Sequence, residues 1–449
     1  MDQMPFDIEV KNPWKNRESL PYPNLKKLIP IAILYVLAAM TPIFFAIEGF
    51  AIAAFCGLCA GIIYTVRRPR LVMPILLTGF IPAIMGGGFA MATLILGIIA
   101  STAAGALLFT ASKQSWRMLL LPAIAWTVVY VITREAALAC MTLVTVPASV
   151  LLTVATLRGE RRTSAVCYTL VGLLISVVAL LAIYFTQTYG AIDRSILTLH
   201  FETQRAWVVD VIMGMRDEIA SMWGEAGGNP QLAEQVRTYM TRELVSDAVA
   251  LIYNVLPALV VAACAILAYF SQSLLCGGYL TLGMKKVLTP MAVTFTMSVV
   301  SAVLFLVISF VTSFMSGYGL LYATLQNVAI ILTPGLFLVG FASYSFRVRT
   351  SKGLSKFLYI LLIVMVISVG TVMVFSILAI YGAISVLLAA LGARMLKKMQ
   401  ANLHAEMRFD TDAASDREDE REEAQDEPEN NREEANEEEN NENEEENND

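Results

Sequence analysis

Histidine is scarce in this chain, with His200 and His404 as the only two among 449 residues. A membrane-embedded zinc centre or catalytic triad built on imidazoles is therefore excluded. The sequence also lacks a phosphate-binding glycine loop, an H-E-x-x-H pair and a G-x-S-x-G elbow, and its apolar segments hold no paired carboxylates. We therefore expect no catalytic residues, cofactor or metal, and predict that the chain is not an enzyme and has no ATPase of its own.

The six cysteines are scattered, and their spacing indicates no disulfide framework. Cys56 and Cys59 form a C-x-x-C pair, but they lie in an apolar run without the strand-helix-strand context of a redox motif. Gly57 and Gly61 continue a row of small residues there, and Gly97 and Gly105 belong to another. We interpret both rows as surfaces for close helix packing.

Charged side chains are few, at 16%, while hydrophobic residues make up 57% and the mean hydropathy is +0.63. This composition predicts a multi-pass membrane protein. The net charge of −6 averages two unlike regions: residues 401–449 hold 22 Asp and Glu against 4 Arg, and the rest has an excess of 12 positive charges. The acidic tail lacks apolar periodicity, so we expect it to be disordered.

Apolar runs long enough to cross a membrane as helices predict an all-α fold with about 12 transmembrane segments, in a range of about 10 to 13. Turns are predicted between several of them, at Glu48–Gly49, Gly86–Gly88, Arg134–Glu135, Ser316–Gly319 and Tyr381–Gly382. The predicted runs are residues 28–46, 49–66, 71–86, 89–110, 118–133, 136–157, 166–187, 248–274, 289–314, 320–346, 357–378 and 382–396.

Basic residues fix the predicted orientation. Alternating the runs collects 22 Lys and Arg on one side, against Arg134 and five arginines of the insertion on the other. Because basic loops stay inside the cell, we expect a bacterial cytoplasmic membrane protein with both termini cytoplasmic. The predicted parts are a cytoplasmic segment (1–27), N-terminal transmembrane helices (28–187), an extracytoplasmic insertion (188–247), C-terminal transmembrane helices (248–396) and a cytoplasmic acidic tail (397–449).

The insertion predicts an outward-facing amphipathic helical hairpin. Its first helix has an apolar stripe at helical spacing: Val208, Val211, Ile212, Met215, Ile219 and Met222. Asn229 and Pro230 then predict a helix start. From Pro230 we expect a continuous helix that enters the membrane and runs to Leu275.

Polar side chains within or beside the apolar runs are the candidate substrate-binding residues, because each is costly to bury in lipid. Asp247 and Asn254 are seven residues apart, on one face of the central helix, and Pro257 follows them. Gln326 and Asn327 lie in a later run. Two interpretations stay open: these groups bind a polar solute, or they bond neighbouring helices while Asp247 is solvated at the interface.

The layout around "LVSDAVALIYNVLPALVVAACAILAYFSQSLL" resembles the YybS-like bacterial membrane proteins, a family of unknown function. The resemblance extends over residues 28–394 and is strongest over 244–275. The family has no assigned catalytic residues to transfer. Its N-terminal half is loosely similar to the substrate-binding components of energy-coupling-factor transporters.

Two functions follow as predictions. The first is a transport or small-solute-binding membrane component, whose partners are the lipid bilayer and an energising protein at the basic cytoplasmic loops. The alternative is a non-transporting scaffold that recruits partners through the outer hairpin and the acidic tail. We expect no binding to nucleic acid.

Overall fold

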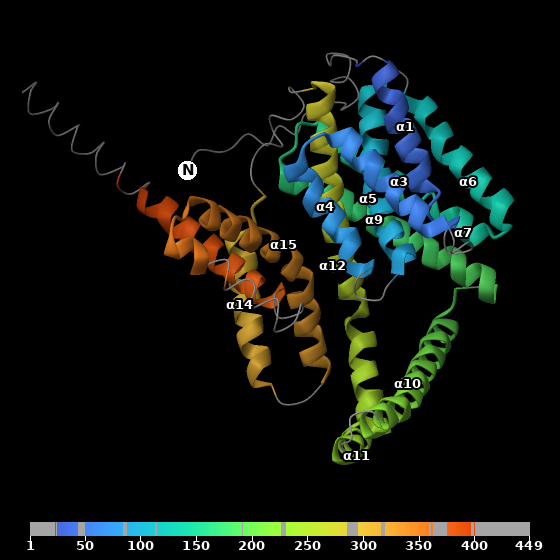
Figure 1. Ribbon diagram of the computed structural model, residues 1–449, viewed down its shortest axis with the longest axis vertical. Coiled ribbons are helices and arrows are strands. Elements are labelled where there is room, and N and C mark those ends of the chain that lie inside the picture. The colour runs from blue at the N-terminus through green and yellow to red at the C-terminus, as the bar shows by residue number, and fades with distance from the viewer. Residues whose placement is uncertain are drawn as a thin grey trace, which may run out of the picture. The chain divides into compact units, whose positions relative to one another are not determined.

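The computed structural model describes residues 23, 25–43, 50–83, 88–112, 115–190, 192–225, 230–284, 295–315, 319–358, 361, 375–396 and 399. The chain divides into two compact units, residues 1–386 and 387–449, and the first contains most of the described residues. Among the described residues all regular structure is helical, and no strand occurs (Figure 1). The all-α prediction is confirmed for this part of the chain.

The N-terminal helices of the first unit follow the predicted apolar runs. Their bounds are α1 Leu25–Ala39, α3 Ala51–Val66, α4 Pro69–Pro82, α5 Gly88–Ala111, η4 Ser115–Leu119, α6 Leu120–Thr133, α7 Ala136–Met141, α8 Thr145–Leu157 and α9 Arg162–Tyr189.

The remaining helices comprise the insertion and the second apolar half. Their bounds are α10 Arg194–Glu225, α11 Pro230–Tyr239, α12 Arg242–Leu282, α14 Val299–Phe314 and α15 Leu320–Thr350, followed by a helix over Phe375–Leu396.

Within the described residues, six helical segments are long and apolar enough to cross a membrane: Gly88–Ala111, Ala136–Leu157, Arg162–Tyr189, Arg242–Leu282, Leu320–Thr350 and Phe375–Leu396. Four shorter apolar helices also coincide with predicted runs: Ala51–Val66, Pro69–Pro82, Arg117–Thr133 and Val299–Phe314. These four fall short of the ~20 residues that a perpendicular crossing needs. Most of the predicted run 357–378 and the acidic tail lie outside the described residues.

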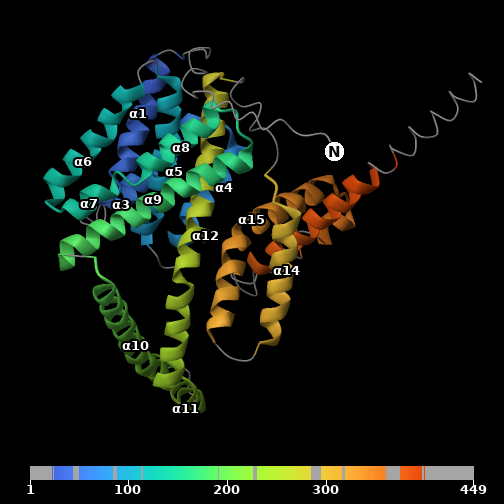
Figure 2. The same ribbon diagram turned by 180° about the vertical axis from the view of Figure 1, so that it is seen from behind.

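Helix α5 is the centre of the N-terminal packing, because α1, α3, α4, α8 and α12 all contact it (Figure 2). Gly97 and Gly105 permit two of these contacts. A Cβ at Gly97 would lie 2.9 Å from the Ala38 carbonyl oxygen, and one at Gly105 would lie 2.6 Å from the Ser149 hydroxyl. The small-residue row predicted from the sequence therefore lies in a helix interface.

The predicted turn at Arg134–Glu135 is confirmed. Arg134 ends α6 with a left-handed φ of 58°, and extended Glu135 precedes α7. The Ser316–Gly319 turn is consistent with α14 ending at Phe314 and α15 starting after Gly319, although residues 316–318 are outside the described part. Residues 48, 49, 86 and 87 of the other predicted turns are also outside it.

The predicted turn at Tyr381–Gly382 is wrong, because both residues lie inside the helix Phe375–Leu396. Gly382 instead faces α15: a Cβ there would collide with the Leu336 carbonyl oxygen. Gly340 on α15 in turn faces the backbone of Leu378 and Gly382. The two glycines serve mutual backbone contact between helices, the other use of glycine in membrane segments.

The prediction of an unbroken helix from Pro230 to Leu275 is also wrong. Helix α11 ends at Tyr239, and α12 begins at Arg242 after extended Thr241. The Thr241 hydroxyl accepts a hydrogen bond from the Leu244 N–H. Threonine at such a position satisfies a free helix N–H and so starts a new helix.

Candidate functional site

Helix α12 connects the candidate residues. Its 41 residues correspond to about 60 Å at ~1.5 Å per residue, about twice the hydrocarbon thickness of ~30 Å. It contacts α10 and α15 as well as α3, α4, α5 and α9 (Figure 1). Its first half packs Val245 and Val249 against α10, and its second half places Leu274, Leu275 and Tyr279 in the core of the N-terminal helices. Polar groups on α12 therefore lie at interfaces with several different helices.

The structure brings two predicted residues together. The Asn327 side-chain Nδ2 on α15 donates a hydrogen bond of 3.0 Å to the main-chain carbonyl of Asn254 on α12. This carbonyl can only accept, so the contact fixes which end of the Asn327 amide is the NH₂ group. The Asn254 side chain itself is exposed. The contact supports the helix-bonding interpretation for Asn327, and it leaves the Asn254 amide available.

The other end of the Asn327 amide is unusual. Its Oδ1 is buried and has no hydrogen-bond partner within the described part of the chain. A buried acceptor without a partner costs about 1–3 kcal/mol. A group that donates a hydrogen bond to this oxygen would recover that free energy.

Gln326 and Asp247 do not join this contact. The Gln326 Nε2 donates to the Tyr322 hydroxyl of its own helix at 3.1 Å. Asp247 is exposed near the start of α12. The neighbouring Ser246 instead contacts α10, where the Arg205 guanidinium donates to its hydroxyl and to its carbonyl oxygen at 3.0 and 3.2 Å.

Helices α10 and α12 pack through only part of the predicted apolar stripe of α10. Val209 is buried against Val245 and Val249, with Ile212 and Met213 beside it. Predicted stripe residues Val208 and Ile212 take part, whereas Val211, Met215 and Met222 are exposed together with Trp207. Helix α10 therefore has apolar side chains on two faces, and the sequence period alone did not tell which face meets α12.

An ion pair closes the end of this contact, between Arg242 Nη2 and Asp210 Oδ1 at 2.6 Å. Both side chains are more than half exposed, at 68% and 60%, so the pair contributes little stability. Nearer the start of α10, His200 Nδ1 and the Tyr189 hydroxyl are 2.6 Å apart, and the rings of Phe185 and Phe201 contact the imidazole. These contacts connect the end of α9 to the start of α10.

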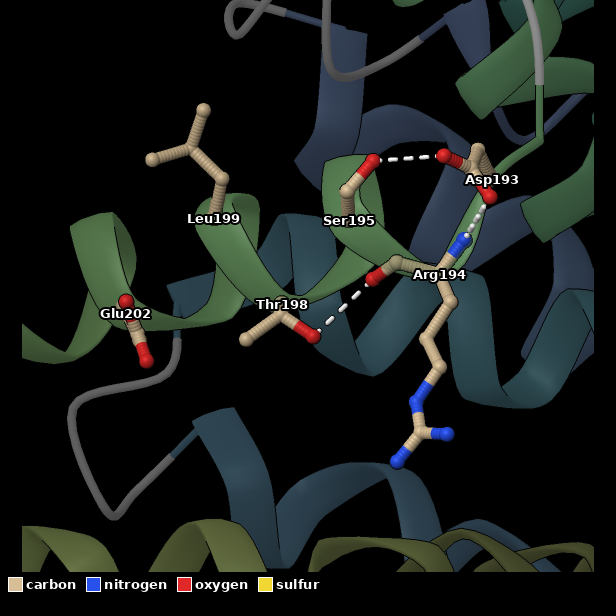
Figure 3. A pocket seen from close by; sticks show the side chains of 6 residues that line it. All are labelled: Asp193, Arg194, Ser195, Thr198, Leu199 and Glu202. Atoms are coloured by element: carbon tan, nitrogen blue, oxygen red, sulfur yellow. Dashed lines mark hydrogen bonds between the residues drawn. The ribbon is translucent and has the colours of Figure 1, made fainter.

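A depression of about 570 Å³ lies at the start of α10 (Figure 3). Its lining comes from one stretch of chain: Asp193, Arg194, Ser195, Thr198, Leu199 and Glu202. The Asp193 carboxylate accepts bonds from the Ser195 hydroxyl and the Arg194 N–H, and these bonds lower the pKa of Asp193. Because this carboxylate already occupies the helix N-terminus and one helix cannot enclose a ligand, we do not assign a site here.

A polar cluster on the second half of α12 was not predicted from the sequence, in which Arg162 is one of several loop charges. The Arg162 Nε donates to Gln272 Oε1 at 3.0 Å, and its Nη2 donates to the Ser273 hydroxyl at 2.7 Å. The guanidinium also lies 4.7 Å from the centre of the Tyr269 ring. The signal in the sequence was the run Ser271-Gln272-Ser273 inside an apolar segment, which required a polar partner.

The described residues include no candidate metal site, because nowhere among them do three His, Cys, Asp or Glu side chains come together.

The family model "Predicted membrane protein (DUF2232)" matches residues 80–384, about two thirds of the chain and most of its described helices. No curated protein and no solved structure matches the chain.

Proposed function

Because the chain belongs to this family of predicted membrane proteins, we propose that it is a transport or small-solute-binding component without an ATPase of its own. The observation that carries the proposal is the Asn327 amide between α12 and α15, whose Oδ1 is buried without a partner among the described residues. Buried acceptors in folded proteins are usually hydrogen-bonded, so this oxygen requires a partner. A solute with a hydrogen-bond donor would satisfy it.

The chemistry of the solute follows from the groups around this amide. Asn327 offers a neutral acceptor, and the exposed Asn254 amide offers both donors and an acceptor. Asp247 lies two helical turns from Asn254 on the same face of α12, and its carboxylate repels anions. The proposed substrate is therefore a small neutral or cationic polar molecule. In this proposal the chain is not an enzyme and does not bind nucleic acid.

Membrane placement is part of the proposal. We place the chain in a bacterial cytoplasmic membrane with about 12 spans, both termini inside and residues 188–247 outside. In this orientation an energising partner binds the basic cytoplasmic loops, in keeping with the sequence likeness to the YybS-like proteins and to the energy-coupling-factor components. The alternating count places the basic loops on one side of the membrane and α10 and α11 on the other, and this distribution supports the orientation.

Cysteine labelling tests the orientation. In a variant whose six native cysteines are replaced, Glu218→Cys on exposed α10 should react with a membrane-impermeant maleimide in intact cells. Lys352→Cys, just after α15, should react only after permeabilisation. The reverse pattern would require the opposite orientation, and equal labelling of both in intact cells would refute the separation of the two sides.

Uptake measurements test the solute site. In a deletion strain screened for loss of uptake of polar metabolites, we expect Asn327→Leu to fail to restore uptake, with a loss of roughly tenfold or more, since one hydrogen bond to a buried group contributes ~1–3 kcal/mol. Gln326→Leu is the matched control, because among the described residues this neighbouring amide bonds within its own helix, α15. If Asn327→Leu restores uptake fully, the solute site is not at Asn327.

A specific observation also favours the scaffold alternative. Trp207, Val211 and Met215 recur every four residues on α10, and all three are exposed. A recurrent apolar face of this kind fits a partner helix or the membrane surface. The scaffold alternative predicts that a Trp207→Ser and Met215→Ser double variant fails to reverse the growth defect of the deletion strain. Asn327→Leu should reverse that defect fully.

A further inference from the structure

Arg162, the first residue of α9, has no counter-ion in the part of the chain that the structure describes. Its side chain is half-buried, and its contacts are with neutral groups: Gln272, Ser273 and the Tyr269 ring. Among the described residues no carboxylate lies within ion-pair distance of it, Glu160 in the preceding loop included. A partly desolvated charge without a counter-ion is unfavourable in a membrane protein.

The partners of Arg162 are themselves fixed. Gln272 is fully buried, and its Nε2 donates to the Cys276 Sγ at 3.1 Å, so its Oε1 is turned toward the guanidinium. Ser273 is 6% exposed, and its hydroxyl donates to the Tyr269 carbonyl oxygen. The guanidinium is thereby held in one orientation, and its bonds to Gln272 and Ser273 occupy two of about five N–H donors. The Nη1 group has no hydrogen-bond acceptor among the described residues, so its two donors are open to a further acceptor.

The end of α9 at which Arg162 lies also favours an anion. Arg161 precedes the helix in an extended conformation, and its side chain makes no capping bond. The first N–H groups of α9 therefore lack a side-chain cap, and the helix dipole adds partial positive charge there. An arginine at this position opposes the dipole unless an anion is bound. The side chains of a helix lean toward its N-terminus. The Arg162 side chain and the first N–H groups therefore both belong to the N-terminal end of α9.

From these contacts we propose that Arg162, oriented by Gln272 and Ser273, binds a phosphate group at the N-terminal end of α9. A phosphate offers the geometry that a guanidinium fork and free helix N–H groups accept together. The group belongs either to the headgroup of an anionic phospholipid or to a soluble phosphate. This site is separate from Asn327, and it does not depend on the proposed solute function.

Binding to the full-length protein in a zwitterionic detergent tests the proposal. The two probes are phosphatidylglycerol added in mixed micelles, with phosphatidylcholine as its reference, and inorganic phosphate. The readouts are the shift in the thermal unfolding midpoint and the mass of bound lipid in native mass spectrometry, because a ligand of the folded state raises the midpoint. Stabilisation by phosphatidylglycerol alone identifies a lipid headgroup, and stabilisation by inorganic phosphate identifies a soluble anion. Stabilisation by neither probe overturns the proposal.

Variants then locate the site. Arg162→Gln should weaken the apparent affinity for the effective probe roughly tenfold or more, as expected for a charge-assisted hydrogen bond. Arg161→Gln, an equal loss of charge on an exposed neighbour, should change it by less than about threefold, since exposed charges contribute little. An equal effect of both variants, or no effect of either, would show that the anion binds elsewhere.

The conservative pair covers the case in which Arg162→Gln does not fold. Arg162→Lys keeps the charge but loses the planar fork, so its affinity for the probe should fall several-fold. Arg161→Lys should bind as the original protein does. Binding by Arg162→Lys at the original affinity would overturn the assignment of the site to this guanidinium.

Discussion

Replacing Gly172 with alanine is expected to lower the thermal unfolding midpoint of the detergent-solubilised protein, whereas the same change at Gly214 should raise it. Gly172 lies on α9 against α8. A Cβ there would be 2.5 Å from the Ala148 Cα and 2.7 Å from the Ala148 nitrogen. Both are backbone atoms of a helix and cannot move aside as the end of a flexible side chain does. The two helices must separate, at a cost of about 1–3 kcal/mol or more.

Gly214 is the matched control for this change. It lies inside α10, is exposed, and would place a Cβ with nothing within 4 Å. Alanine in the interior of an exposed helix is more favourable than glycine by about 0.5–1 kcal/mol. The opposite signs are the result to look for in a thermal scan of both variants. A stabilised Gly172→Ala would contradict the close contact between α8 and α9.

Glycine also shows how far the sequence could predict the fold. Hydrophobic runs predicted the helices, because a chain in lipid must satisfy its backbone within helices. The use of Gly382 was not predictable from its neighbours, since the same residue type permits a turn or a close contact. The deciding partner, Gly340, lies on another helix, 42 positions earlier in the chain. Local sequence contains no information on that contact.

The candidate site shows the same limit. The sequence pointed to Asn254 and Asn327 because unpaired amides in apolar helices are costly. That Asn327 bonds the main chain of Asn254 rather than its side chain depends on the rotation of α15 about its axis. The role of Arg162 could not be predicted for a related reason. Its partner Gln272 lies 110 residues away along the chain. The two side chains meet only because α9 packs on α12, and this contact orients the guanidinium.

Tyr279 provides the second large effect. Its side chain is fully buried between α12 and the N-terminal core, and its hydroxyl donates to Thr110 Oγ1 on α5 at 2.8 Å. Tyr279→Ala should destabilise the protein by about 3–5 kcal/mol, as removal of a buried aromatic ring does. Tyr279→Phe should cost only about 0.5–1.5 kcal/mol, because the Thr110 hydroxyl keeps its own bond to the Ala106 carbonyl oxygen.

The difference between these two variants separates ring packing from the hydrogen bond, and unfolding midpoints measured in one detergent report both. Tyr239→Ala on α11 controls for the loss of a tyrosine, since that side chain is 73% exposed and should change stability by less than about 0.5 kcal/mol. Equal midpoints for Tyr279→Ala and Tyr239→Ala would mean that α12 does not pack into the N-terminal core. The orientation of Gln272, two turns before Tyr279 on the same helix, would then lose its support, and Arg162 would lose the group that holds its guanidinium in place.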